Sequence, residues 1–284
     1  MADARVVVVG AGAIGSVVAA ELRAGRVAHA ALAGVVRSGG VVDGDGRPVA
    51  DLLGEADIVV EAAGHDALRA LGPIAVAAGA DLVVCSAGAL VDDDLRARLG
   101  SGPGTLHLIP GALGGLDALR AARRAGPLRS VTLRSTKAGP ALVRDWMAPA
   151  LQDGLGRGEP LVAFDGTARE AARRFPESAN VAATLGLCGV GLDDTHVTIL
   201  GGPVGSATSH VVEASGPLGD LVVEMANRPS PDNRRTSAVV PWSAIDTVAR
   251  LAEAHARRDV PRCPSATASA DTSPPLPNKE PNPT

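Results

Sequence analysis

Residues 5–15 read Arg5-Val6-Val7-Val8-Val9-Gly10-Ala11-Gly12-Ala13-Ile14-Gly15. Consecutive valines are typical of a strand that is buried on both faces. A Gly-x-Gly-x-x-Gly pattern follows the valines, and residues 16–22 have the composition of a helix. The order strand, glycine turn, helix predicts a dinucleotide-binding site.

Each glycine of this turn has a separate physical role. Gly10 permits the tight turn, Gly12 lets the backbone approach a pyrophosphate, and Gly15 lets the helix pack against the strand. The free N–H groups at the start of the helix then face the phosphates. We therefore expect Gly10, Gly12, Ala13, Ile14 and Gly15 to bind a cofactor, the alternative being a glycine-rich turn without a ligand.

The composition excludes some classes of function. Hydrophobic residues make up 46% of the 284 residues but aromatic residues only 1%, so the core must be built from Ala, Val and Leu. Nucleic-acid binding by base stacking is therefore not expected. With 27 basic and 31 acidic side chains, the net charge of −4 does not suggest a polyanion-binding surface.

Cysteine usage and hydropathy indicate a cytoplasmic protein. Cys85, Cys188 and Cys263 are odd in number and lack metal-type spacing, which suits a reducing compartment. No uncharged apolar run reaches the roughly 18 residues of a membrane span. The first strand begins so close to the N-terminus that we expect no signal peptide.

Strand-like and helix-like segments alternate through the first part of the chain. We expect further strands at 30–36, 57–61, 81–85 and 105–109, with helices at 66–80 and 91–99. This alternation predicts an α/β fold, in which residues 1–112 form an N-terminal Rossmann dinucleotide-binding domain with a parallel, doubly wound sheet. Such sheets bind ligands beyond the carboxyl ends of their strands.

The choice between NAD and NADP stays open. In NAD-preferring sites an acidic residue about 20 positions after the glycine turn holds the ribose. Between Glu21 and Asp43 the chain has no acidic residue, and Arg37 and Ser38 stand where the second strand should end. Arg37 either accepts a 2′-phosphate or is a solvated loop charge.

The pattern changes after residue 112. Strand-like runs at 130–136, 195–200, 210–214 and 221–225 predict a second α+β domain with a mixed sheet over residues 113–236, and the last two runs flank a hairpin turn. A helix at about 237–258, capped by Ser237 or Ser243, should pack back on the first domain, and Pro241 favours the later start. Residues 261–284 have the composition of a disordered tail.

Several separate motifs of this chain resemble those of one family, the L-aspartate dehydrogenases. Besides the glycine turn, these are the segments 60–63 (Val-Glu-Ala-Ala, with Ala62 beside the expected cofactor), 110–117, 175–176 with 180–184, and 210–212 with 227–230 and 236–237. The resemblance implies that His210 is catalytic and that Ala112 and Asn180 contact NAD. It also implies oxidative deamination of L-aspartate to iminoaspartate or oxaloacetate and ammonia, a homodimer, and a place in pyridine nucleotide biosynthesis.

The residue types fit this chemistry. Histidine titrates near neutral pH and can move the protons that amine oxidation releases. His65 and His107, which also lie near expected strand ends, are the rival histidines, and a structural histidine is the alternative for His210.

A dicarboxylate substrate needs cationic partners. Lys137 directly follows a strand and is either such a partner or an exposed lysine. The family's two prolines after this lysine are Ala138 and Gly139 here. Arg235 stands where the family has a lysine and could clamp a carboxylate. Asn227 and Thr236 either bind substrate or cap turns. Asn180 is also a candidate N-cap for a helix at 181–187.

Two alternatives remain from the sequence. One is another NAD(P)-dependent reductase, similar to homoserine dehydrogenase or dihydrodipicolinate reductase. The other is an NAD(P)-binding sensor that has lost turnover, because the loops at 137–140 and 233–237 depart from the family pattern.

Overall fold

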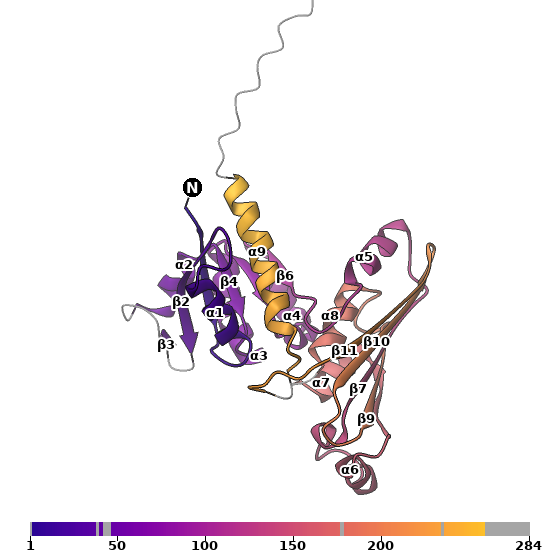
Figure 1. Ribbon diagram of the computed structural model, residues 1–284. Helices are drawn as coiled ribbons and strands as arrows, with labels where there is room; N and C mark the ends of the chain where they lie inside the picture. The colour runs from indigo at the N-terminus through magenta and orange to yellow at the C-terminus, as the bar shows by residue number, and fades with distance from the viewer. Residues whose placement is uncertain (1, 38–39, 42–46, 177–178, 234–235, 259–284) are drawn as a thin grey trace, which may run out of the picture.

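The chain folds around two β-sheets, which lie on opposite sides of the molecule (Figure 1). The computed structural model describes residues 2–37, 40–41, 47–176, 179–233 and 236–258. The N-terminal sheet has six strands and the second sheet has five. Helices α7 and α8 occupy the space between them (Figure 1).

The six-stranded sheet is parallel except at one edge. Its order is β3-β2-β1-β4-β5-β6, and only β3 runs antiparallel to its neighbour. The predicted parallel, doubly wound sheet is confirmed. Its strands are β1 (Ala4–Val9), β2 (Ala30–Arg37), β3 (Gly40–Val41), β4 (Ile58–Glu61), β5 (Asp81–Val84) and β6 (Leu106–Leu108).

The valines of β1 supply both faces of this sheet. Val6 and Val8 pack with α1 (Gly15–Arg23) and α9 (Val240–Arg258). Val7 and Val9 pack on the other face, under α2 (Val49–Gly54), α3 (His65–Ala77) and α4 (Asp93–Leu99). Successive side chains of a strand point to opposite faces, so a strand covered on both sides needs an unbroken apolar run.

The second sheet is mixed, as predicted. In the order β11-β10-β7-β9-β8, only the β7–β9 pair is parallel, and β10 and β11 form the expected hairpin. Strand β8 was not expected, because Asp165 and Gly166 weaken its strand pattern. The strands are β7 (Ser130–Ala138), β8 (Val162–Thr167), β9 (His196–Gly202), β10 (Thr208–Gly216) and β11 (Gly219–Asn227).

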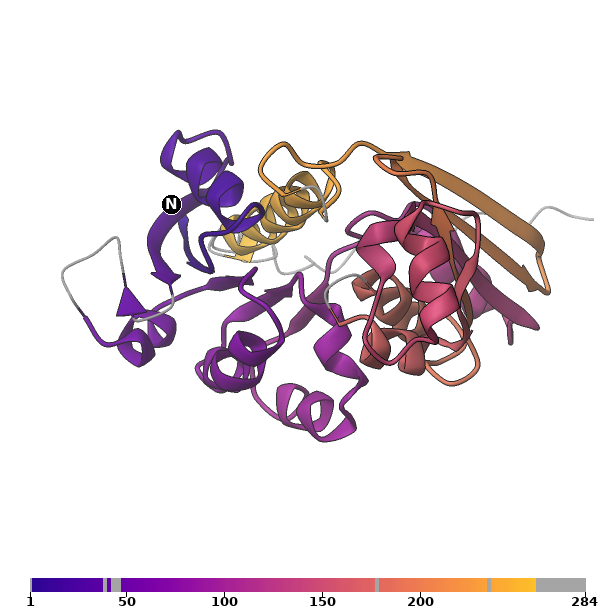
Figure 2. The same ribbon diagram turned by 90° about the horizontal axis from the view of Figure 1, so that it is seen from below.

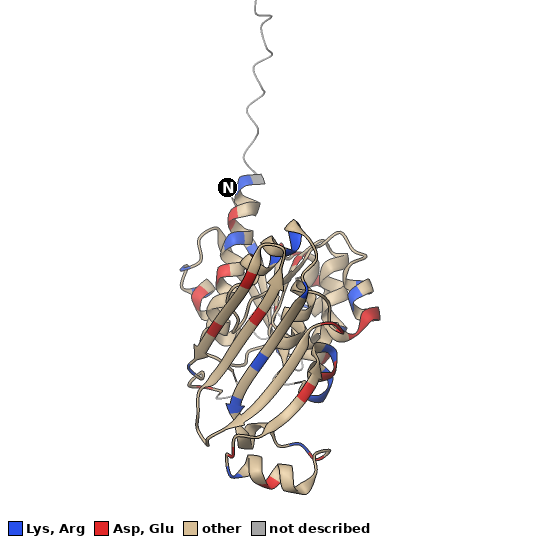
Figure 3. Cartoon of the chain, turned by 90° about the vertical axis from the view of Figure 1, so that its right-hand side faces the viewer, with Lys and Arg blue, Asp and Glu red and all other residues tan. Residues whose placement is uncertain are grey.

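Helices cover only the inner face of the second sheet. Helices α5 (Leu116–Ala125), α7 (Ala168–Arg174) and α8 (Asn180–Cys188) share one core with its inward side chains. Charged residues of both signs stand along its strands (Figure 3), and Arg134, Glu213 and Glu224 among them are exposed. The short η2 (Gly139–Leu142) and α6 (Pro149–Gly156) follow β7 at one end of the sheet.

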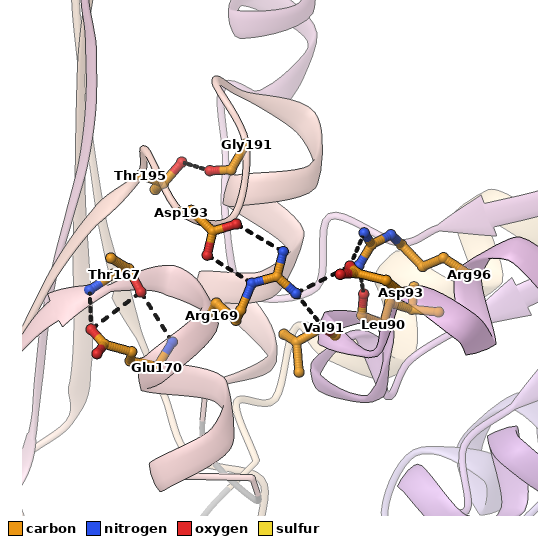
Figure 4. A network of polar contacts seen from close by, with 10 residues as sticks. All are labelled: Leu90, Val91, Asp93, Arg96, Thr167, Arg169, Glu170, Gly191, Asp193 and Thr195. Atoms are coloured by element: carbon orange, nitrogen blue, oxygen red, sulfur yellow. Dashed lines mark hydrogen bonds and ion pairs between the residues drawn. The ribbon is translucent and has the colours of Figure 1, made fainter.

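Arg169 of α7 joins the second sheet's helices to the first part of the chain (Figure 4). Its guanidinium forms two bonds to Asp193, at 2.7 and 2.8 Å. It also donates to the carbonyl of Val91, at the end of η1 (Ala87–Val91), and to the Asp93 carboxylate at the start of α4. This ion pairing lowers the pKa of both carboxyls.

The C-terminal helix α9 begins at Val240, between the two candidate caps Ser237 and Ser243, so the expectation that Pro241 favours the later start is wrong. Pro241 lies in the first turn, where its missing N–H leaves no helical hydrogen bond unmade. Ser243 therefore lies inside the helix, where its hydroxyl accepts a bond from the Gly111 N–H at 3.0 Å instead of capping the start. Figure 2 shows α9 lying along the first sheet. The bounds predicted for the two domains stay predictions, and the tail at 261–284, with Cys263, lies outside the described residues.

None of the helices described is both long enough and apolar enough to cross a membrane.

Candidate active site

Two adjoining cavities lie between the two sheets. The outer cavity runs along the glycine turn and the loops after β4 and β5, and its lining includes Gly12, Ala62 and His65. The inner cavity reaches the second sheet, and its lining includes Lys137 and His210. Among the described residues, three line both cavities: Ile14, Asn180 and Thr236.

The glycine turn has the geometry that a dinucleotide requires. A Cβ at Gly10 would lie 2.6 Å from the Ala62 carbonyl oxygen, and one at Gly15 would lie 2.0 Å from the Gly10 oxygen. Among the described residues, Gly12 has no such neighbour within 4 Å, so its backbone borders open space at the start of α1. Gly10 and Gly15 are thus required by packing, whereas Gly12 keeps a cradle open for a ligand.

The other predicted cofactor residues differ in position. Ala13, Ile14 and Ala62 line the outer cavity, and Ala112 lines the inner one. Arg37 ends β2 with an exposed side chain and lines neither cavity, while Ser38 lies outside the described residues. The predicted contact of Arg37 with a 2′-phosphate stays a prediction.

Glu61, to which the sequence analysis assigned no role, is buried behind the wall of the outer cavity and binds residues that line it. Its Oε1 accepts bonds from the N–H groups of Ala63 and Gly64 at 2.9 and 2.8 Å, and its carboxylate also accepts bonds from Ser86. Burial raises the pKa of this carboxyl, against the effect of these bonds. The signal in the sequence that could have indicated a role for Glu61 is that an acidic residue ends an otherwise apolar strand.

The register of the second sheet brings the predicted catalytic residues together. His210 of β10 lies opposite Ser135 of β7, and Lys137 follows two residues later on the same face of β7. Thr208 stands on the same face of β10 as His210, because it lies two residues before it. Thr208, His210 and Lys137 all line the inner cavity.

His210 is almost fully buried, with 2% of its surface exposed. Burial, reinforced by the nearby Lys137 charge, lowers its pKa to about 3, so the imidazole is neutral at pH 7. The Ser135 hydroxyl lies 2.8 Å from Nδ1, which leaves Nε2 as the ring nitrogen for a ligand in the cavity. Ser135 is a residue that sequence analysis missed, although it alternates with Lys137 along the predicted strand.

Lys137 is the cation of the inner cavity among the described residues. Burial lowers its pKa to about 8, and the Arg144 charge contributes in the same direction. The hydroxyl-bearing residues Thr208, Thr236 and Ser237 line the same space. An ammonium group and hydroxyls around one small cavity can bind a carboxylate.

The predicted substrate residues have three different outcomes. The Asn227 amide donates to the Ala112 carbonyl at 3.0 Å and lines neither cavity, so it holds the loop after β6 in place. Arg235 lies outside the described residues, as does Arg234. Thr236, in contrast, lines both cavities.

The prediction that Asn180 caps its helix is wrong. The residue preceding α8 is Ala179, and Asn180 is the first helical residue. Its Oδ1 accepts a bond from the Gly88 N–H at 2.9 Å and lies 3.4 Å from Nε2 of His65. The Asn180 side chain, which the sequence suggested as a helix cap, is therefore held by Gly88 and His65, from two other segments of the chain.

The other histidines have different surroundings. His107 and His255 both contact the Asp81 carboxylate, at 2.9 and 2.8 Å, and line neither cavity. His65 lines the outer cavity and stays near the candidate site. Cys85 lines the inner cavity, and its burial raises the thiol pKa well above the usual value. Within the described residues, no cluster of three or more His, Cys, Asp or Glu could hold a metal ion.

Two family models match the chain. Residues 10–101 match the NAD binding domain of homoserine dehydrogenase, which supports the prediction of a dinucleotide-binding first part and an NAD(P) cofactor. Residues 117–251 match the C-terminal domain of aspartate dehydrogenase.

Curated relatives and solved structures agree with these matches. An L-aspartate dehydrogenase 2 of Bordetella pertussis is 37% identical over 262 residues, which cover 87% of this chain and 96% of the relative. An L-aspartate dehydrogenase of Pseudomonas aeruginosa is 40% identical, over 70% of this chain and 75% of its own.

The fold is shared with a crystal structure of aspartate dehydrogenase from Thermotoga maritima, with a TM-score of 0.65, 24% identity, and coverage of 87% of this chain and 96% of that one. A hyperthermophilic archaeal homoserine dehydrogenase in complex with NADPH also shares it, with a TM-score of 0.57, 11% identity, and coverage of 89% and 98%. From the extent and identity of the match to the Bordetella relative, the chain belongs to the aspartate dehydrogenase family.

Proposed function

We propose that this chain is an NAD(P)-dependent L-aspartate dehydrogenase. It oxidises L-aspartate to iminoaspartate, which water hydrolyses to oxaloacetate and ammonia. The observation that carries the proposal is the pairing of His210 and Lys137 in the inner cavity, which adjoins the cavity along the glycine turn. The names of the curated relatives support the same substrate.

The cofactor would be held along the two cavities. The backbone at Gly12 and the start of α1 would hold the pyrophosphate, and Ile14, Ala112 and Asn180 would border the nicotinamide half. When bound, the nicotinamide ring accepts the hydride that leaves the substrate's Cα.

His210 is the group proposed to move protons. With Nδ1–H donating to the Ser135 oxygen, the Nε2 lone pair is available to take a proton from the substrate ammonium and, after releasing that proton to solvent, to take one from the attacking water. Without ligand its pKa of about 3 makes the ring neutral but a weak base. A bound dicarboxylate would raise this pKa and so favour proton uptake.

Lys137 is proposed to bind a substrate carboxylate. An ammonium group with a pKa of about 8 is mostly charged at neutral pH, and a carboxylate partner would raise that pKa further. Thr208 and Thr236 would supply hydrogen bonds to the same group, and Arg235 is proposed for the second carboxylate.

The remaining parts of the proposal concern cellular context. A reducing cytoplasm is supported by Cys85 and Cys188, which form no disulfide in the described part of the chain. A homodimer, a role for Arg37 in NADP use, and a supply of imine to pyridine nucleotide biosynthesis complete the proposal.

Absorbance of reduced nicotinamide at alkaline pH tests the function. L-Aspartate should give a signal with NAD or NADP, while L-glutamate and L-alanine should not. A signal with homoserine instead would favour the second candidate function, a reductase similar to homoserine dehydrogenase. The match of residues 10–101 to the NAD binding domain of that enzyme is the observation that favours this candidate. NADH binding without turnover of any of these substrates would identify a sensor.

A further inference from the structure

Asn180 stands where the two cavities meet, and groups from the first part of the chain hold its side chain. It opens α8, which belongs to the second sheet's core. Its contacts come from Gly88 in η1, which follows β5, and from His65, which opens α3. The carboxamide is therefore positioned from across the boundary between the two sheets.

Both contacts involve the same atom, Oδ1. The Gly88 N–H donates to it at 2.9 Å. The His65 Nε2 lies 3.4 Å from it, a long contact. Burial lowers the pKa of His65. Because an amide oxygen only accepts, an Nε2–H group is the donor in this contact.

The packing leaves no room for a side chain at residue 88. A Cβ on Gly88 would lie 2.7 Å from Nε2 of His65 and 2.8 Å from Oδ1 of Asn180. Contacts this short do not occur, so a side chain at residue 88 would displace one group or both. The absence of a side chain at Gly88 is thus what lets the histidine and the amide meet.

With Oδ1 held, the amide's NH₂ group takes the opposite direction. Among the described residues none accepts a hydrogen bond from Nδ2 of Asn180, and Asn180 lines both cavities. This pair of donors is available to an acceptor on a ligand in the cavities. Under the proposed function, the nicotinamide carboxamide oxygen is such an acceptor.

We propose that His65 is a positioning residue that, together with the Gly88 backbone, orients the Asn180 carboxamide toward the nicotinamide end of the bound dinucleotide. This inference rests on the proposed function only for the identity of the ligand. It predicts that removing the His65 side chain weakens the binding of ligands that carry the nicotinamide ring. In a variant that lacks the Asn180 side chain, removing His65 should have no such effect.

Titration calorimetry with NADH and with ADP-ribose, which lacks the nicotinamide, tests the proposal on the full chain. His65→Ala should weaken NADH binding about fivefold to tenfold, the effect of about one hydrogen bond, and leave ADP-ribose binding within about twofold. His65→Gln, whose amide can still donate, should restore most of the loss. If the wild type prefers NADPH, that ligand and 2′-phospho-ADP-ribose take their places.

A double-mutant cycle shows whether His65 acts through Asn180. In an Asn180→Ala background, His65→Ala should cause no further loss of NADH affinity. His107→Gln is the matched control, since His107 also contacts a side-chain oxygen but lies outside both cavities, and its affinities should equal those of the wild type.

Three results would overturn the inference. These are equal weakening of NADH and ADP-ribose, unchanged NADH binding in His65→Ala, and additive losses in the double variant. A wild type that binds neither NADH nor NADPH would overturn it as well. Because binding is the readout, a wild type that binds NADH but does not turn over L-aspartate would count against the proposed function alone.

Discussion

The Ser135 hydroxyl lies 2.8 Å from Nδ1 of His210, across the antiparallel ladder between β7 and β10. Both side chains are 2% exposed, so solvent does not compete for this contact. The serine therefore fixes the ring plane and, through Nδ1, which nitrogen faces the inner cavity.

Replacing His210 should remove proton transfer but not the cofactor site. His210→Asn is expected to lower kcat by about 10²–10⁴-fold, the usual contribution of a positioned acid–base group. Ser135→Ala should lower kcat by roughly tenfold, because the ring remains but loses its orienting bond. Steady-state kinetics with L-aspartate measures both, and NADH affinity should be unchanged. Near-normal turnover by His210→Asn would refute the catalytic role.

Lys137 should reduce stability near neutral pH. Its folded-state pKa of about 8 lies below the ordinary value of 10.5, so the folded chain binds this proton more weakly than the unfolded chain does. The free energy of unfolding contributed by Lys137 should then rise as the pH increases from about 8 to 10.5. Lys137→Met should raise Tm at pH 7 and remove this rise. Thermal scans between pH 7 and 10.5 measure it, and a lower Tm at pH 7 would contradict it.

The same substitution should weaken substrate binding. If Lys137 binds a carboxylate, Lys137→Met should increase KM for L-aspartate by about tenfold or more, from the loss of a charge-assisted bond. In the wild type, KM should increase as the pH rises past about 8, where the free enzyme loses this charge. Initial rates across pH 6.5–9.5 test this, and a pH-independent KM would argue against the role.

Alanine substitutions at two glycines of the turn should affect different properties, ligand binding at Gly12 and stability at Gly15. The added methyl group of Gly12→Ala meets no atom of the described residues within 4 Å, so Tm should stay unchanged. NADH binding should fall, because the methyl group occupies the phosphate cradle. Gly15→Ala would place a Cβ 2.0 Å from the Gly10 oxygen and should lower Tm. Thermal unfolding and NADH fluorescence separate the two. Unchanged NADH affinity in Gly12→Ala would count against the cradle.

Arg169 should stabilise the contact between the two parts of the chain. Its side chain is 16% exposed and bonds Asp193, Asp93 and the Val91 carbonyl (Figure 4). Arg169→Ala should lower the free energy of unfolding by about 1–2 kcal/mol. The Val91 carbonyl loses this hydrogen-bond donor, and the packing of the aliphatic part of the Arg169 side chain is lost as well. Urea denaturation measures it. Arg157→Ala is the control, because the Arg157–Glu159 pair is exposed and should contribute little; equal losses would show that Arg169 has no special role.

The sequence by itself determined the elements whose signals are local. The valines of β1, the glycine turn, the alternation of the first part and the β10–β11 hairpin all follow from periodicity and turn chemistry, and they appear as expected. His210, Lys137 and Asn180 were also named from the sequence, and the fold places all three along the inner cavity. Their proposed roles stay predictions.

Only the tertiary structure decided which side chains meet. The register of β7 against β10 places Ser135 opposite His210. Because η1 packs near α8, the Asn180 side chain accepts a hydrogen bond from the Gly88 N–H instead of capping its own helix. Asp81 engages His107 and His255 from elements far apart in the chain. Such contacts depend on strand pairing and domain packing between distant segments. A local pattern carries no record of them, because the free energy that fixes them is gained only when the whole chain has folded.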